Sequence, residues 1–387
     1  MEQTPAGPPR PTPLVARRTV IKTAAVAAGG MVAGSVAAAC AAPRPGWTFD
    51  PRSPAADLSG ASPVPSIAPG HETGHPSSAP TGAPATGAPA MAGHDDEAKA
   101  VTDRFLAGEW QQIPGYGNQP IEPTVEGDAK VYRMTIDPIV HHITATMDPV
   151  DALGYNGTWP GPVMRLTEGD LMRATFQNNM PESTSVHFHG QSMPNAMDGV
   201  PFITQPPIMP GESFTYEFRV SPAGSHMYHS HHNATDQVGR GLLGALIIEP
   251  KDPAQRYDQK YGATQDIIWI SNDAYGGFTI NGRQFPATAP LVAKKGEVIV
   301  VRFMNEGVMM HPWHLHGMPM RVVARDGYPL GNAEFTCDTL GVNPGERFDV
   351  VITCDNPGAW AFHCHILPHA EGPRGMFGMV TALIVQE

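Results

Sequence analysis

Residues 344–365 read PGERFDVVITCDNPGAWAFHCH, and both ends of this stretch have counterparts earlier in the chain. Its first residues, Pro344-Gly345-Glu346, recur as Pro210-Gly211-Glu212. Its last residues, His363-Cys364-His365, recur at the same spacing as His229-Ser230-His231. Matching segments that keep one spacing indicate an internal duplication. The sequence therefore predicts two related domains.

Both halves of the chain alternate short apolar runs with turn residues. Residues 214–220, 298–303 and 348–353 are such runs. This pattern predicts β-strands, and no long segment has the periodicity of a helix. We therefore expect an all-β protein with two antiparallel β-sandwich domains, at residues 104–250 and 262–387.

The composition restricts the class of protein. The 387 residues carry a formal net charge of −12, which argues against nucleic acid as a partner. Residues 41–103 are dominated by Pro, Ala, Ser, Thr and Gly, so we expect a disordered linker there. Three histidines of this stretch, His71, His75 and His94, are interpreted as solvated spacer residues.

The first 40 residues have the features of a targeting segment. Arg17-Arg18 precedes a mildly apolar run at residues 23–39, as in a bacterial twin-arginine (Tat) export signal. Ala37-Ala38-Ala39-Cys40 resembles a lipoprotein cleavage box. We therefore expect an extracytoplasmic protein, at the cell surface, in the periplasm or secreted, which a lipid on Cys40 would tether to the membrane. Cleavage near Ala39 with free secretion is the alternative.

Histidine pairs are the strongest chemical signal in the sequence. Ten of the 17 histidines lie in or beside four His-x-His pairs. The pairs are His187-Phe188-His189, His229-Ser230-His231, His314-Leu315-His316 and His363-Cys364-His365, with His311 and His369 nearby. In a strand this spacing places both imidazoles on one face, so the pairs supply convergent nitrogen ligands. They exceed the needs of one tetrahedral zinc site, whereas imidazole suits copper.

Cys364 stands between two of these imidazoles. Because side chains of a strand alternate, Cys364 points to one face and His363 and His365 to the other, which predicts a junction between two metal sites. A thiolate with two nearby histidines and a later methionine suits a blue-copper electron-transfer site. The first half of the chain has Ser230 at the position of Cys364, so only the second half can hold a thiolate-bound copper.

These motifs resemble those of the multicopper oxidases, whose domains have the cupredoxin (Greek-key) fold. The four histidine signatures occur in the family's order, and residues 155–162 and Asp198-Gly199 support the match. The length and the single cysteine site resemble the two-domain group that includes the small bacterial laccases. The resemblance implies about four copper ions per chain, one type 1, one type 2 and two type 3. It also implies a homotrimer with trinuclear sites between subunits.

The resemblance assigns a role to each motif residue. The implied type 1 ligands are His311, Cys364 and His369, with Met376 as the weak axial ligand. The implied type 2 ligands are His187 and His314. The implied type 3 ligands are His189, His229, His231, His316, His363 and His365, of which His363 and His365 also connect the cluster to Cys364. Asp198 resembles the acid that assists proton delivery.

The loop after His369 departs from the family pattern. The position at which the family usually carries its axial residue is occupied here by Arg374, which cannot bind copper. Residues 371–374 resemble a loop with an insertion that moves the Gly-Met pair to residues 375–376, and Met379 is the alternative axial ligand. The insertion could shape the substrate entrance or form only a longer turn.

The implied activity is laccase-like, with one-electron oxidation of phenolic or aromatic donors coupled to reduction of O2 to water. A metallo-oxidase acting on Cu(I), Mn(II) or Fe(II) is the alternative, because thioethers favour Cu(I). Methionines near the histidine motifs are Met193, Met197, Met309, Met310, Met318 and Met320. Methionines that fill apolar gaps would give the same pattern.

Two further classes fit the sequence less well. A two-domain copper nitrite reductase carries its type 1 copper in the first domain, which here lacks cysteine. A non-enzymatic copper carrier needs only the Cys364 site and has no use for the other histidine pairs.

Cys337 and Cys354 flank the turn at residues 343–346, so strands that leave this turn could bring them together. In an exported protein a disulfide between them is one interpretation, and two buried free thiols are the other.

Overall fold

The computed structural model describes residues 90–113, 117–273 and 277–387. The predicted export signal, Cys40 and residues 41–89 of the predicted linker, with His71 and His75, lie outside the described residues. Within the described ranges, no helix combines the length and apolar character needed to cross a membrane.

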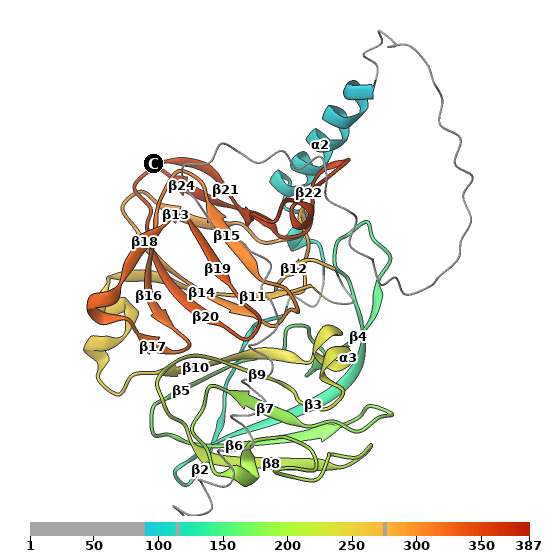
Figure 1. Ribbon diagram of the computed structural model, residues 1–387, viewed down its shortest axis with the longest axis vertical. Coiled ribbons are helices and arrows are strands. Elements are labelled where there is room, and N and C mark those ends of the chain that lie inside the picture. The colour runs from blue at the N-terminus through green and yellow to red at the C-terminus, as the bar shows by residue number, and fades with distance from the viewer. Residues whose placement is uncertain (1–89, 114–116, 274–276) are drawn as a thin grey trace, which may run out of the picture. The chain divides into compact units, whose positions relative to one another are not determined.

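The first domain consists of two sheets that enclose one apolar core (Figure 1). One sheet has the order β1-β5-β10-β9-β7, and the other has β2-β3-β6-β8 with β4 paired to β3. The strands are β1 (Pro120–Ile121), β2 (Thr124–Glu126), β3 (Ala129–His141), β4 (Val150–Tyr155), β5 (Val163–Thr167), β6 (Leu171–Asn178), β7 (Val186–His189), β8 (Ser213–Arg219), β9 (Gly224–Ser230) and β10 (Leu243–Glu249). Phe176, Phe188 and Tyr228 lie between the two sheets in this core.

The second domain repeats this arrangement. One sheet has the order β12-β11-β14-β20-β16-β17, with β18 paired to β16, and the other has β13-β24-β21-β15-β19. The strands are β11 (Ala263–Asn272), β12 (Thr279–Ile280), β13 (Leu291–Lys294), β14 (Val298–Asn305), β15 (His311–Leu315), β16 (Met320–Arg325), β17 (Tyr328–Pro329), β18 (Phe335–Cys337), β19 (Thr339–Val342), β20 (Arg347–Thr353), β21 (Gly358–Cys364) and β24 (Val380–Gln386). Trp269, Trp313 and Phe362 lie in its core.

Short elements complete the described chain. The strands β22 (Glu371–Gly372) and β23 (Gly375–Met376) form a separate hairpin. The helices are α2 (Ala90–Leu106), α3 (Ala234–Gly239), α4 (Tyr257–Lys260) and the 3-10 turns η1 (Glu109–Gln111), η2 (Asn195–Met197), η3 (Pro253–Gln255), η4 (Gly331–Ala333) and η5 (Leu367–His369).

Strand β10 is buried on both of its faces, and its sequence is correspondingly apolar throughout. In β6 buried and half-buried residues alternate, as expected for a strand with one face on the core. In β10 every residue from Leu243 to Ile248 is buried. Leu246 and Ile248 face the core of the first domain, whereas Ala245 and Ile247 pack with Ile268 and Ile270 of the second domain. The continuous apolar run therefore marks the strand that joins the two domains.

A buried polar network also joins the domains. Arg302 of β14 is only 4% exposed, and its Nε donates to Asp266 Oδ1 at 2.6 Å. Its Nη1 donates to Ser225 Oγ of β9 at 2.9 Å, and that hydroxyl donates to Asp349 Oδ1 of β20 at 2.6 Å. One serine of the first domain is thereby held by two charged groups of the second.

The prediction of an all-β, cupredoxin-like architecture is confirmed. The structure adds parallel strand pairs to the antiparallel ones that we expected, namely β1 with β5, β3 with β6, β5 with β10, β11 with β14 and β13 with β24. These pairs join strands that are not consecutive in the sequence. The alternation of apolar and polar residues within a strand does not indicate which other strand pairs with it.

Helix α2 corrects the linker prediction, which was wrong for residues 90–103. Val101 and Phe105 lie one helical turn apart and pack on the second domain, where the Phe105 and Phe285 ring centroids are 4.9 Å apart. His94, predicted to be a solvated spacer, lies in this helix and is half-buried. Composition averaged over a long window concealed this short amphipathic segment.

Cys337 and Cys354 are free thiols, and the disulfide is not formed. Cys337 lies on β18 and pairs with Met320 of β16, whereas β20, which ends one residue before Cys354, pairs with the other edge of β16. Strand β16 therefore lies between the two cysteines.

Candidate metal centre

His311, Cys364 and His369 form a compact buried group. Cys364 Sγ lies 3.7 Å from His311 Nδ1 and 3.6 Å from His369 Nδ1. All three residues are buried, and their ligand atoms lie close enough together to hold one metal ion. Burial raises the pKa of the Cys364 thiol to about 11, so a metal must displace its proton on binding. A thiolate with two imidazole nitrogens fits copper.

Asp273, at the end of β11, orients His311. Its Oδ2 lies 3.0 Å from His311 Nε2, and both side chains are fully buried. Burial alone would raise the pKa of Asp273, but His311 and the backbone N–H groups of Val308 and Met309 lower it below its usual value. A charged Asp273 keeps the proton of His311 on Nε2, which leaves Nδ1 free to bind metal.

The environment of His369 is aromatic and apolar. The rings of Phe278 and His369 are stacked, with centroids 3.9 Å apart. Met379 is fully buried in the same apolar cluster as Cys364, whereas Met376 on β23 is 36% exposed. The axial ligand predicted from the sequence, Met376, thus lies nearer the surface than its alternative, Met379.

The four histidines of the first domain's two His-x-His pairs line one cavity of about 370 Å³. His187, on β7, has its ring centroid 5.5 Å from that of His229 and 5.6 Å from that of His231. His189 Nδ1 lies 3.4 Å from His229 Nε2. In β7 the apolar neighbours Val186 and Phe188 are buried, so strand alternation turns the imidazoles toward the cavity.

Burial keeps three of these imidazoles, those of His187, His189 and His229, neutral. It lowers the pKa of His189 to about 3 and that of His229 to about 4, and it lowers the pKa of His187. Neutral imidazole is the form that binds metal, so the cluster is ready to accept an ion at neutral pH.

The four histidines of the second domain's two His-x-His pairs are gathered in the same way, but they are more exposed. His314 has its ring centroid 4.8 Å from that of His316 and 5.3 Å from that of His365, and His316 Nε2 lies 3.1 Å from His363 Nε2. None of these four histidines is among the described residues that line the cavity of the first-domain cluster, although Glu306 and Gly307 of the second domain are. Among the described residues, the ring contacts and close nitrogen pairs of these histidines lie within each cluster, not between the two clusters.

Backbone carbonyls fix the tautomers of histidines that occupy corresponding positions in the two domains. His229 Nδ1 lies 2.9 Å from Ser230 O, and His363 Nδ1 lies 3.0 Å from Cys364 O. His187 Nδ1 donates to Asp198 O at 2.7 Å, and His314 Nδ1 lies 2.9 Å from Asp338 O. Because a carbonyl can only accept, each of these rings carries its proton on Nδ1 and offers Nε2 to a metal.

The turn at Asp198-Gly199 holds His187 in place. Gly199 has φ +87°, and a Cβ there would lie 1.9 Å from Val186 O, so no larger residue fits. Asp198 Oδ1 lies 3.5 Å from His187 Nδ1 and its side chain is 35% exposed. The carboxyl predicted to deliver protons is therefore beside the cluster and open to solvent.

Glu306 is a second acid at the cavity that the sequence analysis missed. It lies in the loop between β14 and β15 and lines the cavity of the four histidines. Its Oε1 is buried without a hydrogen-bond partner among the described residues, and burial raises the pKa of Glu306 to about 8. A protonated carboxyl is therefore expected beside the cluster at neutral pH.

Strand β21 connects the two kinds of site. Cys364 pairs with Trp313 and His363 with His314 across β15 and β21. Cys364 and Phe362 are buried on one face of β21, whereas His363 and His365 are less buried. Strand β21 and the residue that follows it therefore present the thiolate to the His311–His369 group and two imidazoles, those of His363 and His365, to the second-domain histidine cluster.

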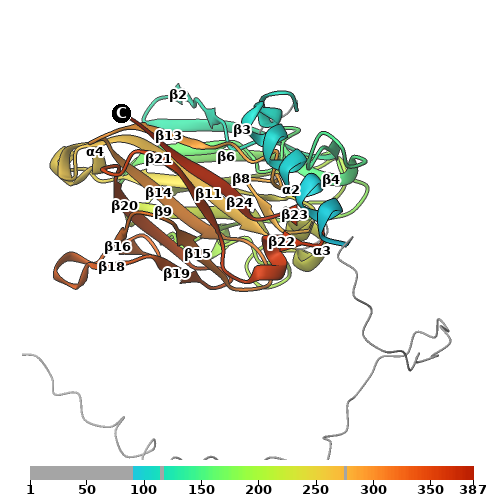
Figure 2. The same ribbon diagram turned by 90° about the horizontal axis from the view of Figure 1, so that it is seen from above.

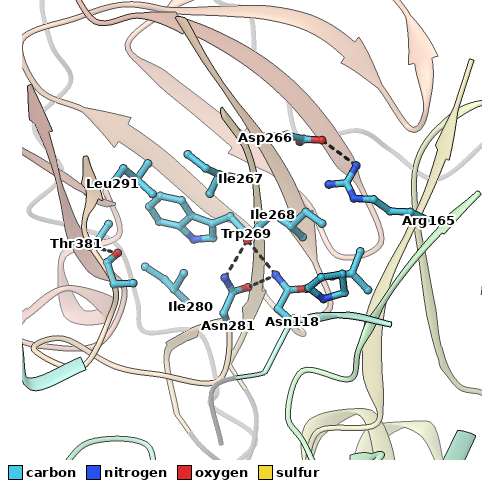
Figure 3. Close-up of a pocket in the computed structure, with 13 residues that line it drawn as sticks. Asn118, Arg165, Asp266, Ile267, Ile268, Trp269, Ile280, Asn281, Leu291 and Thr381 are labelled. Atoms are coloured by element: carbon cyan, nitrogen blue, oxygen red, sulfur yellow. Dashed lines mark hydrogen bonds and ion pairs between the residues drawn. The ribbon is translucent and has the colours of Figure 1, made fainter. Parts of the chain in front are cut away.

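A further cavity, of about 390 Å³, lies between the domains (Figure 3). Asn118 and Asn281 both bond the backbone oxygen of Ile268, and Arg165 pairs with Asp266 at 2.9 Å. None of the histidines and cysteines discussed above lines this cavity. It belongs to the domain interface and not to the metal centre.

Comparison with known proteins identifies the family. Residues 140–253 and 254–386 each match a family model described as multicopper oxidase. This chain belongs to the multicopper oxidase family. Membership implies copper as the metal, which agrees with the sulfur and nitrogen ligands gathered here. Among solved structures, the multicopper oxidase mgLAC is 34% identical with a TM-score of 0.62, over 66% of this chain and 86% of that chain.

Curated relatives in the family are longer proteins. Copper resistance protein A of Pseudomonas syringae pv. tomato is 40% identical over 61% of this chain and 48% of its own length. Laccase-2 of Botryotinia fuckeliana is 31% identical over 58% of this chain and 45% of its own length. The chain thus spans less than half of either relative.

Proposed function

We propose that this multicopper oxidase takes electrons one at a time from phenolic or other aromatic donors and reduces O2 to water. The observation that carries the proposal is the pairing of β15 with β21, which places a thiolate group and an imidazole cluster on opposite faces of one strand pair. When bound, copper would supply one-electron oxidation at the first group and dioxygen reduction at the second.

The residues of the chain supply binding, orientation and protons. Cys364, His311 and His369 would hold the type 1 copper in a buried site, with Asp273 fixing His311. The type 2 copper would be held by His187 and His314, and the type 3 pair by His189, His229, His231, His316, His363 and His365. Asp198 and Glu306 would deliver protons to the cluster.

Oxygen uptake tests this activity. The copper-loaded protein should consume one O2 for about four molecules of 2,6-dimethoxyphenol oxidised, without release of hydrogen peroxide. Cys364→Ser should abolish uptake and the visible thiolate absorption, because the serine oxygen does not replace the sulfur ligand. Peroxide as the main product, or wild-type activity in Cys364→Ser, would contradict the proposal.

We further propose that the two clusters meet between chains in a homotrimer. The grouping of the histidines into two clusters within one chain supports this arrangement, because each cluster supplies only half of the implied ligands. The open face of each first-domain cluster would be covered by the second domain of a neighbouring chain, and the reverse.

Complementation between inactive variants tests the trimer. His229→Ala damages the first-domain cluster and His363→Ala the second-domain cluster, so each alone should be inactive. Co-production of both should restore a fraction of activity if the sites form between chains. A mixture of His187→Ala with His229→Ala is the control and should stay inactive. Failure of the first mixture, with mixed oligomers present, would place each site within one chain.

A metallo-oxidase is the second candidate function. Met309 and Met310, which precede His311, are 41% and 43% exposed, whereas Met318 and Met320 are buried in the core. Met193 and Met197 pack against the first-domain core. Exposed thioethers beside the type 1 group favour Cu(I), and copper resistance protein A is among the relatives. Comparison of kcat/KM for phenols, Cu(I), Mn(II) and Fe(II) would decide between the two functions.

We also propose export through the twin-arginine route with a lipid on Cys40, on the basis of the residues quoted above. Replacement of Arg17-Arg18 by two lysines should leave the protein in the cytoplasm. Mass spectrometry of the exported protein should find diacylglycerol on Cys40, and an unmodified N-terminus after Ala39 would contradict the tether.

A further inference from the structure

A groove of about 690 Å³ lies between helix α2 and the chain that follows His369. Helix α2 forms one wall, and the β22–β23 hairpin forms another. The two elements lie side by side in Figure 2. Loop residues near 144–147 and 284–286 complete it. The volume is within the range of about 300–1,000 Å³ that is usual for small-molecule sites.

The groove adjoins the loop that carries His369. Phe377, which lines the groove, donates its backbone N–H to Ala370 O at 3.0 Å. Ala370 follows His369 in the chain and packs with Phe105 and Phe285 in one apolar cluster. A molecule in the groove would therefore lie only a few side chains from a type 1 ligand.

The walls of the groove are held firmly. A Cβ on Gly375 would lie 2.6 Å from Ala98 Cβ, so α2 rests directly on the hairpin. At the other end of the helix, Arg104 Nη2 donates to Glu109 Oε1 at 2.9 Å and to Thr146 Oγ1 at 3.0 Å. The groove is thus a preformed site between two anchored elements.

The lining of the groove favours an aromatic reductant over Mn(II) and Fe(II). Met147, Phe285, Pro286, Pro373 and Phe377 give it broad apolar and aromatic surfaces. Among the described residues that line it, the one acid is Glu97 and the two bases are Arg104 and Arg374. Mn(II) and Fe(II) would need several oxygen ligands and are repelled by guanidinium groups, whereas a flat aromatic ring suits these walls.

We propose that this groove binds the aromatic reductant of the oxidase and that α2 is part of the substrate site. The inference rests on the proposed function and adds its location and its residues. The insertion after His369 then has a role, because the β22–β23 hairpin supplies the wall that faces α2.

Filling the groove tests this inference in the copper-loaded, full-length protein. Ala100 is exposed on α2 and lines the groove, so Ala100→Trp should occupy the space of the ring. We expect KM for 2,6-dimethoxyphenol to rise about tenfold or more with little change in kcat. The redox-inert analogue 1,2,3-trimethoxybenzene should bind the wild-type protein in calorimetry and lose binding in this variant. Asp96→Trp, an exposed change on the same helix that lies outside the groove lining, is the matched control.

The visible thiolate absorption of both variants shows whether the copper site is intact. Unchanged KM and unchanged analogue binding in Ala100→Trp, with the absorption retained, would overturn the groove assignment. A loss of Cu(I) oxidation with unchanged phenol kinetics would overturn the assigned substrate class. If the wild-type protein took up no O2 with any phenol, the proposed function itself would fail, whereas analogue binding would still report on the groove.

Discussion

Asp273 carries a buried charge next to His311, which we propose as a ligand of the type 1 copper. Asp273→Asn keeps the size of the side chain but removes the negative charge 3.0 Å from His311 Nε2. We expect the reduction potential of the type 1 copper to rise, because the more positive oxidised state loses a stabilising charge, and copper affinity to fall roughly 10- to 100-fold. A redox titration of the visible absorption measures the potential. Asp355→Asn, an exposed acid of the same domain, should change neither quantity.

His141 makes the stability of the fold sensitive to acid. It is 4% exposed, its Nε2 donates to Gly282 O at 2.6 Å, and burial lowers its pKa to about 4. Between pH 6.5 and 4 the unfolded chain binds a proton here and the folded chain does not. The free energy of unfolding should therefore fall as pH drops through this window, by about 2 kcal/mol at pH 5 from this residue.

Urea unfolding of the copper-free protein at pH 7 and pH 5 checks this expectation. His141→Gln should show a smaller loss of stability between the two pH values than the wild-type protein. His142→Gln changes the adjacent, less buried imidazole and serves as the control. An identical loss in His141→Gln and the wild type would contradict the assignment.

At the scale of elements, the turn at residues 198–199 positions His187 of β7, which we propose as a copper ligand. Gly199→Ala forces a Cβ against Val186 O at a positive φ, so the turn must move and Asp198 O must leave His187. We expect a loss of about 1–3 kcal/mol in stability and partial loss of type 2 copper in the electron paramagnetic resonance spectrum. Gly211→Ala, also at positive φ but with open space around it, should keep its copper.

The elements also show what the sequence can predict. The strand faces of the His-x-His pairs follow from local alternation, and the duplication identified the two domains. Asp273, Phe278 and Glu306 could not be assigned, because each reaches its partner through pairings between distant strands and loops. Helix α2 was missed since its apolar positions are few and lie in a stretch whose composition is that of a linker.

At the scale of the whole molecule, Arg302 couples the domains. Arg302→Ala would leave the carboxylate of Asp349, which is 1% exposed, without its cationic neighbour. We expect a loss of about 3–5 kcal/mol in the free energy of unfolding, and unfolding in two steps instead of one. Arg133→Ala, which breaks an exposed pair with Glu126, should cost no more than about 1 kcal/mol. Calorimetry of the copper-free protein would distinguish these outcomes.

The ladder between β15 and β21 has a consequence for biogenesis. Trp313 pairs with Cys364 and His314 with His363, so the ligands of both kinds of site depend on one alignment of two strands. A slip by a single residue during folding would exchange the faces of every side chain in the ladder. Such a misfolded chain would lose the thiolate group and the imidazole cluster together, and it would be colourless as well as inactive. The intensity of the blue colour should therefore report the fraction of correctly folded chains in a copper-saturated preparation.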